Sequence, residues 1–203
     1  MVNKTLIIFA KLPRPGEVKT RLGSEVGMSE ASEIYQEFAQ HAFSIGDQLS
    51  AKGVKIYLFY DARASKEDIQ AWVRHSFVLT PQVGETLGER MYNAFEKTFN
   101  EGAHRSIVIG TDVPELDTAT VLNAFELLDS HKVVVGPSTD GGYYLLGMNR
   151  PTKEIFKGIK WSTDSVCRET IKRLDLLSLS YSVLPELADI DTKDDYARYL
   201  RRL

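Results

Sequence analysis

Short apolar runs of strand length alternate with helix-like segments along most of this 203-residue chain. The run at residues 5–9 is almost wholly apolar, as expected for a strand that is covered on both faces. Similar runs recur at 54–60 and 107–109, and segments with apolar residues at helical spacing, such as 86–99, lie between them. This alternation predicts an α/β fold with a mostly parallel, doubly wound sheet.

The last third of the chain departs from this alternation. A glycine pair leads into a strand-like run at 141–147, and another strand-like run follows at 179–184. Because both lie close in sequence to the run at 132–135, they predict a small antiparallel excursion of the sheet. No segment has the composition of a linker, so we expect one domain spanning residues 1–203.

The overall charge argues against a general polyanion binder. The net charge is −3 and the pI is near 5.9, whereas affinity for a nucleic-acid backbone needs a clustered cationic surface. No apolar run approaches the length of a membrane span, and Met1 leads directly into a short strand without a signal-peptide layout. We therefore expect a cytoplasmic monomer or homodimer that binds neither nucleic acid nor membrane. The single cysteine, Cys167, cannot form an internal disulfide and does not suggest a zinc site.

Residues 11–22 are predicted to form a cation-rich loop after the first strand, ahead of a helix that Ser29 caps. Gly16 permits a close backbone approach, but the spacing matches neither a Walker A loop nor a dinucleotide fingerprint. A polyphosphate would suit a loop at this position, because Arg can donate hydrogen bonds to two phosphate oxygens at once and Lys supplies a point charge. A solvated basic loop without a ligand is the alternative. The cationic side chains are Lys11, Arg14, Lys19 and Arg21.

A second segment, at 82–91, places a polar residue and glycines ahead of a helix. Gln82 offers a donor and an acceptor to the edge of a base, and Gly84 would let a ring lie against the backbone. An ordinary helix-entry loop explains the same residues. With the loop cations and Gly16, we predict that Gln82, Gly84 and Arg90 bind a nucleotide.

Two carboxylates that are far apart in the chain each follow a strand-like run. Asp112 and Asp191 should therefore emerge near sheet ends, where open α/β sheets place their ligands. Mg²⁺ or Mn²⁺ prefers one or two protein carboxylates together with phosphate oxygens and water, so this pair could complete a metal site. Asp189 rivals Asp191 for the second position, and a helix cap or turn is the alternative role for each aspartate.

Between the two carboxylates, residues 137–144 have the makings of a loop that binds an acceptor substrate. Adjacent glycines would admit the substrate close to the main chain, and a carboxylate and a phenol could hydrogen-bond its hydroxyls. Asp-Gly-Gly is equally an ordinary turn signal. Trp161 could line the same cleft or could anchor a helix to the core. The predicted substrate-binding residues are Asp140, Gly141, Gly142 and Tyr143.

Taken in order, these motifs resemble a bacterial family of GT-A-type glycosyltransferase-like proteins, also labelled selenodomain-associated transferases. More distantly, the chain is similar to phospholactate guanylyltransferase and the molybdenum cofactor nucleotidyltransferases. The resemblance spans nearly the whole chain and rests on Lys11-x-Pro-x-Pro-Gly-x-x-Lys-Thr-Arg-Leu22, Gln82-x-Gly84, Leu87-Gly88-x-Arg90-Met91, Gly110-Thr-Asp-x-Pro114, Gly136-Pro-x-x-Asp-Gly-Gly-Tyr143 and Asp189-Ile-Asp-Thr192.

The resemblance implies the nucleotide-diphospho-sugar transferase (GT-A) fold, a Rossmann-like mixed sheet with the nucleotide over its first half. It implies a divalent metal held by Asp112 and Asp191. It also implies that Lys19 and Arg21 act as the cations of the phosphate loop, which with Asp112 form the predicted catalytic set.

The leading hypothesis is a metal-dependent nucleotidyltransferase, which moves a nucleoside monophosphate from a nucleoside triphosphate to a small phosphorylated or hydroxylated acceptor. Sugar-transferring GT-A enzymes typically carry a second carboxylate two residues after the first, whereas this chain has Pro114 there. That difference favours nucleotidyl transfer. A GT-A glycosyltransferase that uses a nucleotide-sugar donor is the second hypothesis, and a non-catalytic nucleotide-binding module is the third.

Overall fold

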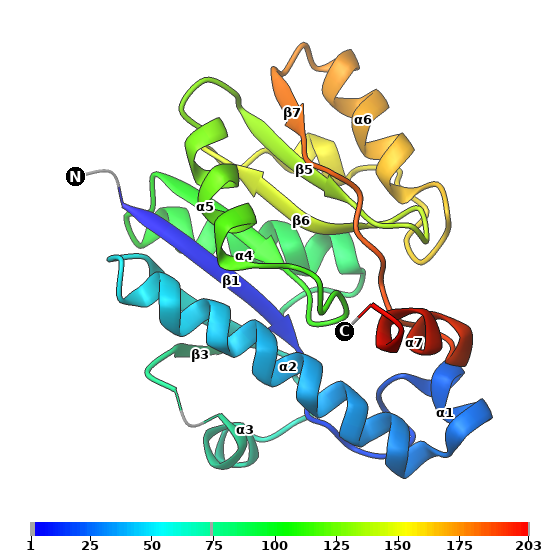
Figure 1. Ribbon diagram of the computed structural model, residues 1–203. Coiled ribbons are helices and arrows are strands. Elements are labelled where there is room, and N and C mark those ends of the chain that lie inside the picture. The colour runs from blue at the N-terminus through cyan, green and yellow to red at the C-terminus, as the bar shows by residue number, and fades with distance from the viewer. Residues whose placement is uncertain (1–2, 74, 203) are drawn as a thin grey trace.

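The computed structural model describes residues 3–73 and 75–202 and contains one seven-stranded mixed sheet with helices on both faces (Figure 1). The order of the strands across the sheet is β3-β2-β1-β4-β6-β5-β7. Their bounds are β1 (Lys4–Ala10), β2 (Lys55–Tyr60), β3 (Val78–Pro81), β4 (Arg105–Ile109), β5 (Val133–Pro137), β6 (Tyr143–Met148) and β7 (Tyr181–Val183).

Most neighbouring strands run parallel, and β6 is the exception. Strand β1 pairs in parallel with β2 and β4, β2 with β3, and β5 with β7. Strand β6 lies between β4 and β5 and is antiparallel to both. The predicted α/β class is confirmed, and so is an antiparallel excursion, which lies inside the sheet and consists of β6 alone. The run at 179–184 is predicted to share in it, but β7 runs parallel to β5 at the end of the sheet order.

Two hydrophobic layers cover the sheet, one on each face. In β1, Leu6 and Ile8 belong to the layer packed under α2 and α5, whereas Ile7 belongs to the layer under α4 and α6. This alternation is the period of two expected for a strand buried on both faces. The helices are α1 (Thr20–Val26), α2 (Met28–Ser50), α3 (Lys66–Trp72), α4 (Leu87–Asn100), α5 (Thr118–Leu127), α6 (Val166–Leu176) and α7 (Lys193–Leu200), with the 3-10 turn η1 (Lys153–Phe156).

The segment at residues 11–22 differs from the prediction. Its first part is a loop, but helix α1 begins at Thr20, so the segment is not a loop throughout. Ser29 lies inside α2, whose N-cap is Gly27. The reason is that Leu22, Ala31 and Ile34 form a small separate core, and this packing favours a helix where local sequence signals predict a loop.

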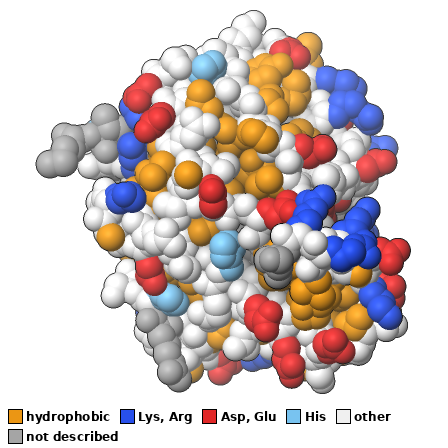
Figure 2. All heavy atoms as spheres, in the orientation of Figure 1, with side chains coloured by type: hydrophobic (Ala, Val, Ile, Leu, Met, Phe, Trp, Pro, Cys, Tyr) orange, Lys and Arg blue, Asp and Glu red, His pale blue; other side chains and the backbone are white. Residues whose placement is uncertain are grey.

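That small core also holds the end of the chain. Ile190 is buried in it, and Tyr196 and Tyr199 of α7 pack against its edge through edge-on contacts with Phe38 of α2. Helices α1 and α7 consequently lie together beside one end of α2 (Figure 1). On the face seen in Figure 2, basic side chains on this side of the molecule are mixed with acidic ones.

None of the described helices is both long and apolar enough to cross a bilayer.

Candidate active site

A cleft of about 970 Å³ opens where β1 and β4 end. Open α/β sheets bind their ligands at the carboxyl ends of the strands, so this is the expected place for a site. Its walls come from the loop before α1, the start of α4, the loop after β4, the turn between β5 and β6, and the segment before α7. The predicted site residues among its lining are Lys11, Lys19, Arg21, Gln82, Arg90, Asp112, Asp140, Gly142, Tyr143 and Asp191.

Lys19 is held in an unusual backbone conformation at the start of α1. Its φ is 46° and its ψ is 44°, a left-handed conformation that non-glycine residues rarely adopt. The residues on either side are anchored, since Val18 is 3% exposed and Leu22 is fully buried. This backbone directs the Lys19 side chain inward, where it is only 3% exposed.

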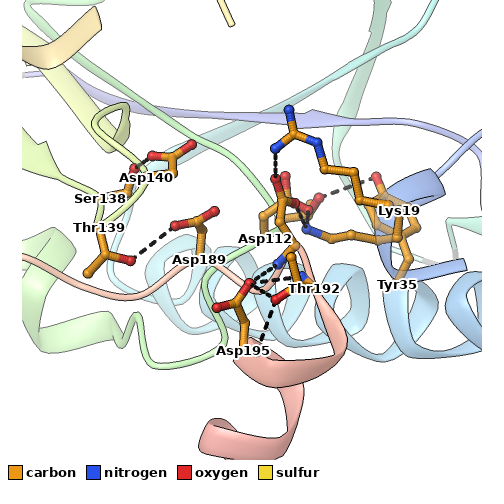
Figure 3. Close-up of polar contacts among 12 residues, drawn as sticks. Lys19, Tyr35, Asp112, Ser138, Thr139, Asp140, Asp189, Thr192 and Asp195 are labelled. Atoms are coloured by element: carbon orange, nitrogen blue, oxygen red, sulfur yellow. Dashed lines mark hydrogen bonds and ion pairs between the residues drawn. The ribbon is translucent and has the colours of Figure 1, made fainter. Parts of the chain in front are cut away.

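The Lys19 ammonium bridges the two carboxylates that the sequence singled out (Figure 3). Its Nζ lies 2.8 Å from Oδ1 of Asp112 and 2.9 Å from Oδ1 of Asp191. Arg21 adds a longer contact, 3.6 Å from its Nη1 to Oδ2 of Asp191, and remains mostly exposed. Two remote acidic residues therefore meet on one buried cation.

Backbone contacts bring the two carboxylates together. Asp112 lies in the segment just beyond β4, after Gly110 and Thr111, and the amide of Ile190 donates to its carbonyl oxygen over 3.1 Å. On the other side, Thr192 caps α7, and Asp195 completes the capping box by accepting hydrogen bonds from the amides of Asp191 and Thr192. Asp191 is thus held between a strand end and a capped helix.

Charge and burial oppose each other at Lys19. Burial lowers the pKa of Lys19, but Asp112 and Asp191 raise it by more, so the pKa lies above its ordinary value. An ammonium enclosed by two carboxylates is stabilised in its charged form. Lys19 therefore carries a full positive charge at neutral pH.

Asp140 and Asp189 form a second acidic pair in the same cleft. Asp140 accepts hydrogen bonds from the hydroxyl of Ser138 and the amide of Gly142, and Asp189 accepts one from Thr139 (Figure 3). Burial, and then the charge of Asp140, raise the pKa of Asp189. Asp189 lies toward Asp140, whereas Asp191 shares the Lys19 ammonium with Asp112. Of the two rival aspartates, Asp191 is therefore the partner of Asp112.

Several other predicted residues have partners within the protein. The Gln82 side-chain amide donates to the carbonyl oxygen of Phe59 over 3.0 Å, and Gln82 is among the residues that line the cleft. Arg90 donates through Nε to the carbonyl oxygen of Gly84. The Tyr143 hydroxyl donates to the Met91 sulfur over 3.6 Å, and Tyr143 packs against the core while it lines the cleft.

Four predicted residues do not line the cleft in the described structure: Arg14, Gly16, Gly84 and Gly141. Arg14 is turned toward α3, where it pairs with Asp68 at 2.8 Å. Gly16 and Gly141 both have positive φ, at 79° and 86°, so each serves the shape of its loop.

The cleft also contains Tyr35, which the sequence patterns did not single out, and Trp161, for which they left two roles open. Tyr35 projects from α2 to the cleft floor and receives a hydrogen bond from Thr111. Trp161 lines the opposite wall and packs so closely on Gly88 that a Cβ there would lie 2.4 Å from the indole. Tyr35 sits on the apolar stripe of α2, so its pattern is that of a core residue.

Two carboxylates alone form an incomplete metal site. Among residues 3–73 and 75–202, no group of three or more His, Cys, Asp or Glu side chains is arranged to hold a metal ion. Mg²⁺ typically binds one or two carboxylates and takes its other oxygens from substrate phosphates and water. Asp112 and Asp191 fit that pattern because they already converge on one cation.

Comparison with known proteins identifies both the family and the fold. Residues 44–163 match the family model described as "Uncharacterized protein conserved in bacteria (DUF2064)". A "putative nucleotide-diphospho-sugar transferase" from Desulfovibrio desulfuricans G20 is 31% identical with a TM-score of 0.93, over 100% of this chain and 88% of that one. None of the curated proteins matches the sequence.

More distant solved structures share the fold alone. CMP:2-keto-3-deoxy-manno-octonic acid synthetase in complex with CTP is 14% identical with a TM-score of 0.59, over 99% of this chain and 100% of that one. Rv0371C from Mycobacterium tuberculosis H37Rv in complex with manganese is 15% identical with a TM-score of 0.59, over 100% of both chains. The resemblance to GT-A-type transferases and the predicted fold are confirmed.

Proposed function

The chain belongs to the DUF2064 family of bacterial proteins, and we propose that it is a transferase that binds a nucleotide in this cleft. The observation that carries the proposal is the meeting of Asp112 and Asp191 on the buried Lys19 ammonium, at the end of the loop after β1. The transferases among its structural relatives support the reaction class.

For the reaction itself we infer metal-dependent nucleotidyl transfer. The acceptor's phosphate or hydroxyl oxygen forms a new bond to the α-phosphorus of a nucleoside triphosphate, the bond to the bridging oxygen breaks, and pyrophosphate leaves. A hydroxyl acceptor also loses its proton, which passes to solvent water. Phosphoryl chemistry of this kind depends on positioning and charge neutralisation more than on a covalent nucleophile. A cleft with buried and exposed cations around two carboxylates suits both requirements.

The cations of the cleft have distinct roles in this proposal. Lys19 is preorganised by its left-handed backbone and would exchange one of its carboxylate contacts for a phosphate oxygen. Arg21 and Lys11 line the cleft with exposed side chains and would take the outer phosphates. The Gln82 side-chain oxygen would accept a hydrogen bond from the base, while its amide nitrogen stays bonded to Phe59.

Mg²⁺ or Mn²⁺ bound by Asp112 and Asp191 would supply further charge neutralisation at the phosphates. The manganese complex of Rv0371C, which has the same fold, supports this expectation. Lys19 occupies the point on which both carboxylates converge, so its ammonium must shift when both carboxylates bind one metal ion.

The acceptor is expected at the opposite wall of the cleft. Asp140 is fixed there by Ser138 and Gly142, and the Tyr143 and Trp161 rings provide apolar surface. A small molecule that carries hydroxyl groups on a compact ring would meet both kinds of surface.

Glycosyl transfer is the second candidate, and the description of the 31% identical relative favours it. In that reaction the acceptor oxygen would attack the sugar carbon, and a nucleoside diphosphate would leave. The two reactions use the same cleft but release different products.

Product analysis separates these candidates. The purified protein is first screened by thermal shift against nucleoside triphosphates and nucleotide sugars, each with and without Mg²⁺ or Mn²⁺. Ligand at about a hundred times its Kd adds about 2.7 kcal/mol of stability, which such a screen detects. Stabilising ligands are then incubated with small phosphorylated and hydroxylated acceptors.

Pyrophosphate release from a triphosphate supports nucleotidyl transfer, and nucleoside diphosphate release from a sugar nucleotide supports glycosyl transfer. Either activity should be lost in Asp112→Asn and kept in Glu101→Gln, a control at the other edge of the sheet. Stabilisation without turnover would support a binding module, and the absence of any stabilisation would contradict the proposal.

A further inference from the structure

Tyr35 touches both segments that supply the charged centre of the cleft. Its phenol oxygen accepts a hydrogen bond from the backbone amide of Lys11 at 2.8 Å and another from the Thr111 hydroxyl at 3.2 Å. Lys11 is the first residue after β1, and Thr111 directly precedes Asp112 after β4. One side chain thus links the start of the phosphate loop to the carboxylate segment.

The linkage is needed because the two segments leave the sheet in different directions. Strands β1 and β4 are paired up to Ile8 and Ile109, and beyond that point their chains no longer share ladder hydrogen bonds. The loop after β1 continues into α1, whereas the segment after β4 turns toward α5. Their relative placement therefore depends on contacts outside the sheet.

Tyr35 provides a fixed reference for these contacts. It lies in the first half of the 23-residue helix α2, which packs along the sheet, and it is only 4% exposed. Burial raises its pKa to about 12, so the phenol keeps its proton and accepts both hydrogen bonds as a neutral group. Loss of the oxygen would leave the Lys11 amide without this partner at a partly buried position.

We propose that Tyr35 is a positioning residue that holds the start of the phosphate loop and the Asp112 segment at a fixed separation, so that one polyphosphate meets both. The inference rests on the proposed function, because it concerns the same cleft. It goes beyond that function by assigning a role to a helix residue outside both loops.

The central experiment compares Tyr35→Phe with Tyr57→Phe. Tyr57 is a matched control, since it is 1% exposed, its hydroxyl donates to Glu101, and it lies at the opposite edge of the sheet. Binding of inorganic tripolyphosphate with Mn²⁺ is measured by calorimetry, because this probe carries the phosphates common to all nucleoside triphosphates. Hydrogen exchange at the Lys11 amide is measured without any ligand.

We expect Tyr35→Phe to bind tripolyphosphate roughly tenfold more weakly and to exchange the Lys11 amide faster, both well below its Tm. Tyr57→Phe should change neither quantity, even where its Tm falls equally. A role in stability alone would lower the Tm of both variants and leave tripolyphosphate binding unchanged.

Thr111 offers an independent test of the same contact. Thr111→Val removes the hydroxyl donor and should also weaken the binding of tripolyphosphate. Thr111→Ser keeps the hydroxyl and should bind tripolyphosphate as tightly as the wild type. Because both groups share one hydrogen bond, the effects of Tyr35→Phe and Thr111→Val should be less than additive in the double variant.

The outcomes separate the two proposals. If the wild type and Tyr35→Phe bind tripolyphosphate equally tightly, the role of Tyr35 is overturned and the proposed function is left intact. Failure of the wild type to bind tripolyphosphate or any nucleotide would overturn the proposed function, and the role of Tyr35 with it. Full additivity in the double variant would also contradict a shared contact.

Discussion

Two polar clusters lie at opposite ends of the central strands and contain lysine and carboxylate side chains in opposite ratios. At the cleft, one ammonium, Lys19, meets two carboxylates. Near the start of β2, one carboxylate, Glu101, meets the ammonium groups of Lys55 and Lys97 and the hydroxyl of Tyr57. We call the first the cleft cluster and the second the amino-end cluster.

Burial separates the two clusters further. The Lys19 side chain is 3% exposed, whereas those of Lys55 and Lys97 are 51% and 42% exposed. Exposed pairs contribute little because water and salt screen them, but a buried charge is costly unless it stays paired. The cleft cluster therefore has two carboxylates around one buried ammonium. That arrangement suits a metal ion that enters together with a polyphosphate. The amino-end cluster is suited to a modest role in stability.

The largest expected difference is between Lys19→Met and Lys97→Met. Removal of the buried ammonium leaves Asp112 and Asp191 facing each other, and we expect a loss of about 2 kcal/mol, below the value for fully buried pairs because both carboxylates are partly exposed. Lys97→Met should cost less than about 1 kcal/mol. Urea unfolding measures both losses.

Manganese sharpens this comparison. Added Mn²⁺ should restore more stability to Lys19→Met than to the wild type, because the carboxylates then lack their internal cation. Equal losses in the two lysine variants, or no differential effect of Mn²⁺, would contradict the contrast between the clusters.

The next effect concerns the metal-dependent part of nucleotide binding. Asp191→Asn should abolish the extra stabilisation that Mg²⁺ or Mn²⁺ gives to a bound nucleotide, whereas Glu101→Gln should retain it. Asp189→Asn should have a smaller effect, since Asp189 faces Asp140 rather than Asp112. Thermal shift with and without metal measures all three. A larger effect from Asp189→Asn than from Asp191→Asn would exchange their roles.

A smaller effect is the pH dependence of the amino-end cluster. Hydrogen bonds from Lys97 and then Tyr57 lower the pKa of Glu101 from 4.5 to about 2. Because the folded pKa is lower than the unfolded one, the contribution to stability is present above pH 4.5 and is lost as the pH falls toward 2. The Tm difference between the wild type and Glu101→Gln should therefore shrink across this window. A Tm difference that grows as the pH falls would contradict a lowered pKa of Glu101 in the folded protein.

The smallest expected effect is that of salt. At about 1 M ionic strength the Debye length is about 3 Å, so exposed pairs are largely screened and buried ones are screened much less. As the NaCl concentration rises, the loss of unfolding free energy caused by Lys97→Met should fall toward zero. The loss caused by Lys19→Met should remain. Parallel urea titrations at two salt concentrations measure this, and an equal decline in both costs would contradict the difference in burial.

Much of the fold could be predicted from local sequence patterns. Asp117 caps α5 and Thr86 caps α4, and both helices lie where their apolar stripes place them. Helix α1 could not be predicted, because it has no side-chain cap and its stability comes from the packing of Leu22 against residues of α2. The same holds for the separation of Asp189 from Asp191, which depends on how the chain between β7 and α7 crosses the cleft.

The sequence by itself determined the alternation of strands and helices and the acidic and basic residues that follow the strands, because periodicity and caps act over a few residues. Only the tertiary structure decided that Lys19 lies between Asp112 and Asp191 and that Tyr35 joins Lys11 to Thr111. Those contacts join parts of the chain that meet only when helices pack on the sheet, and burial there gives each contact its strength.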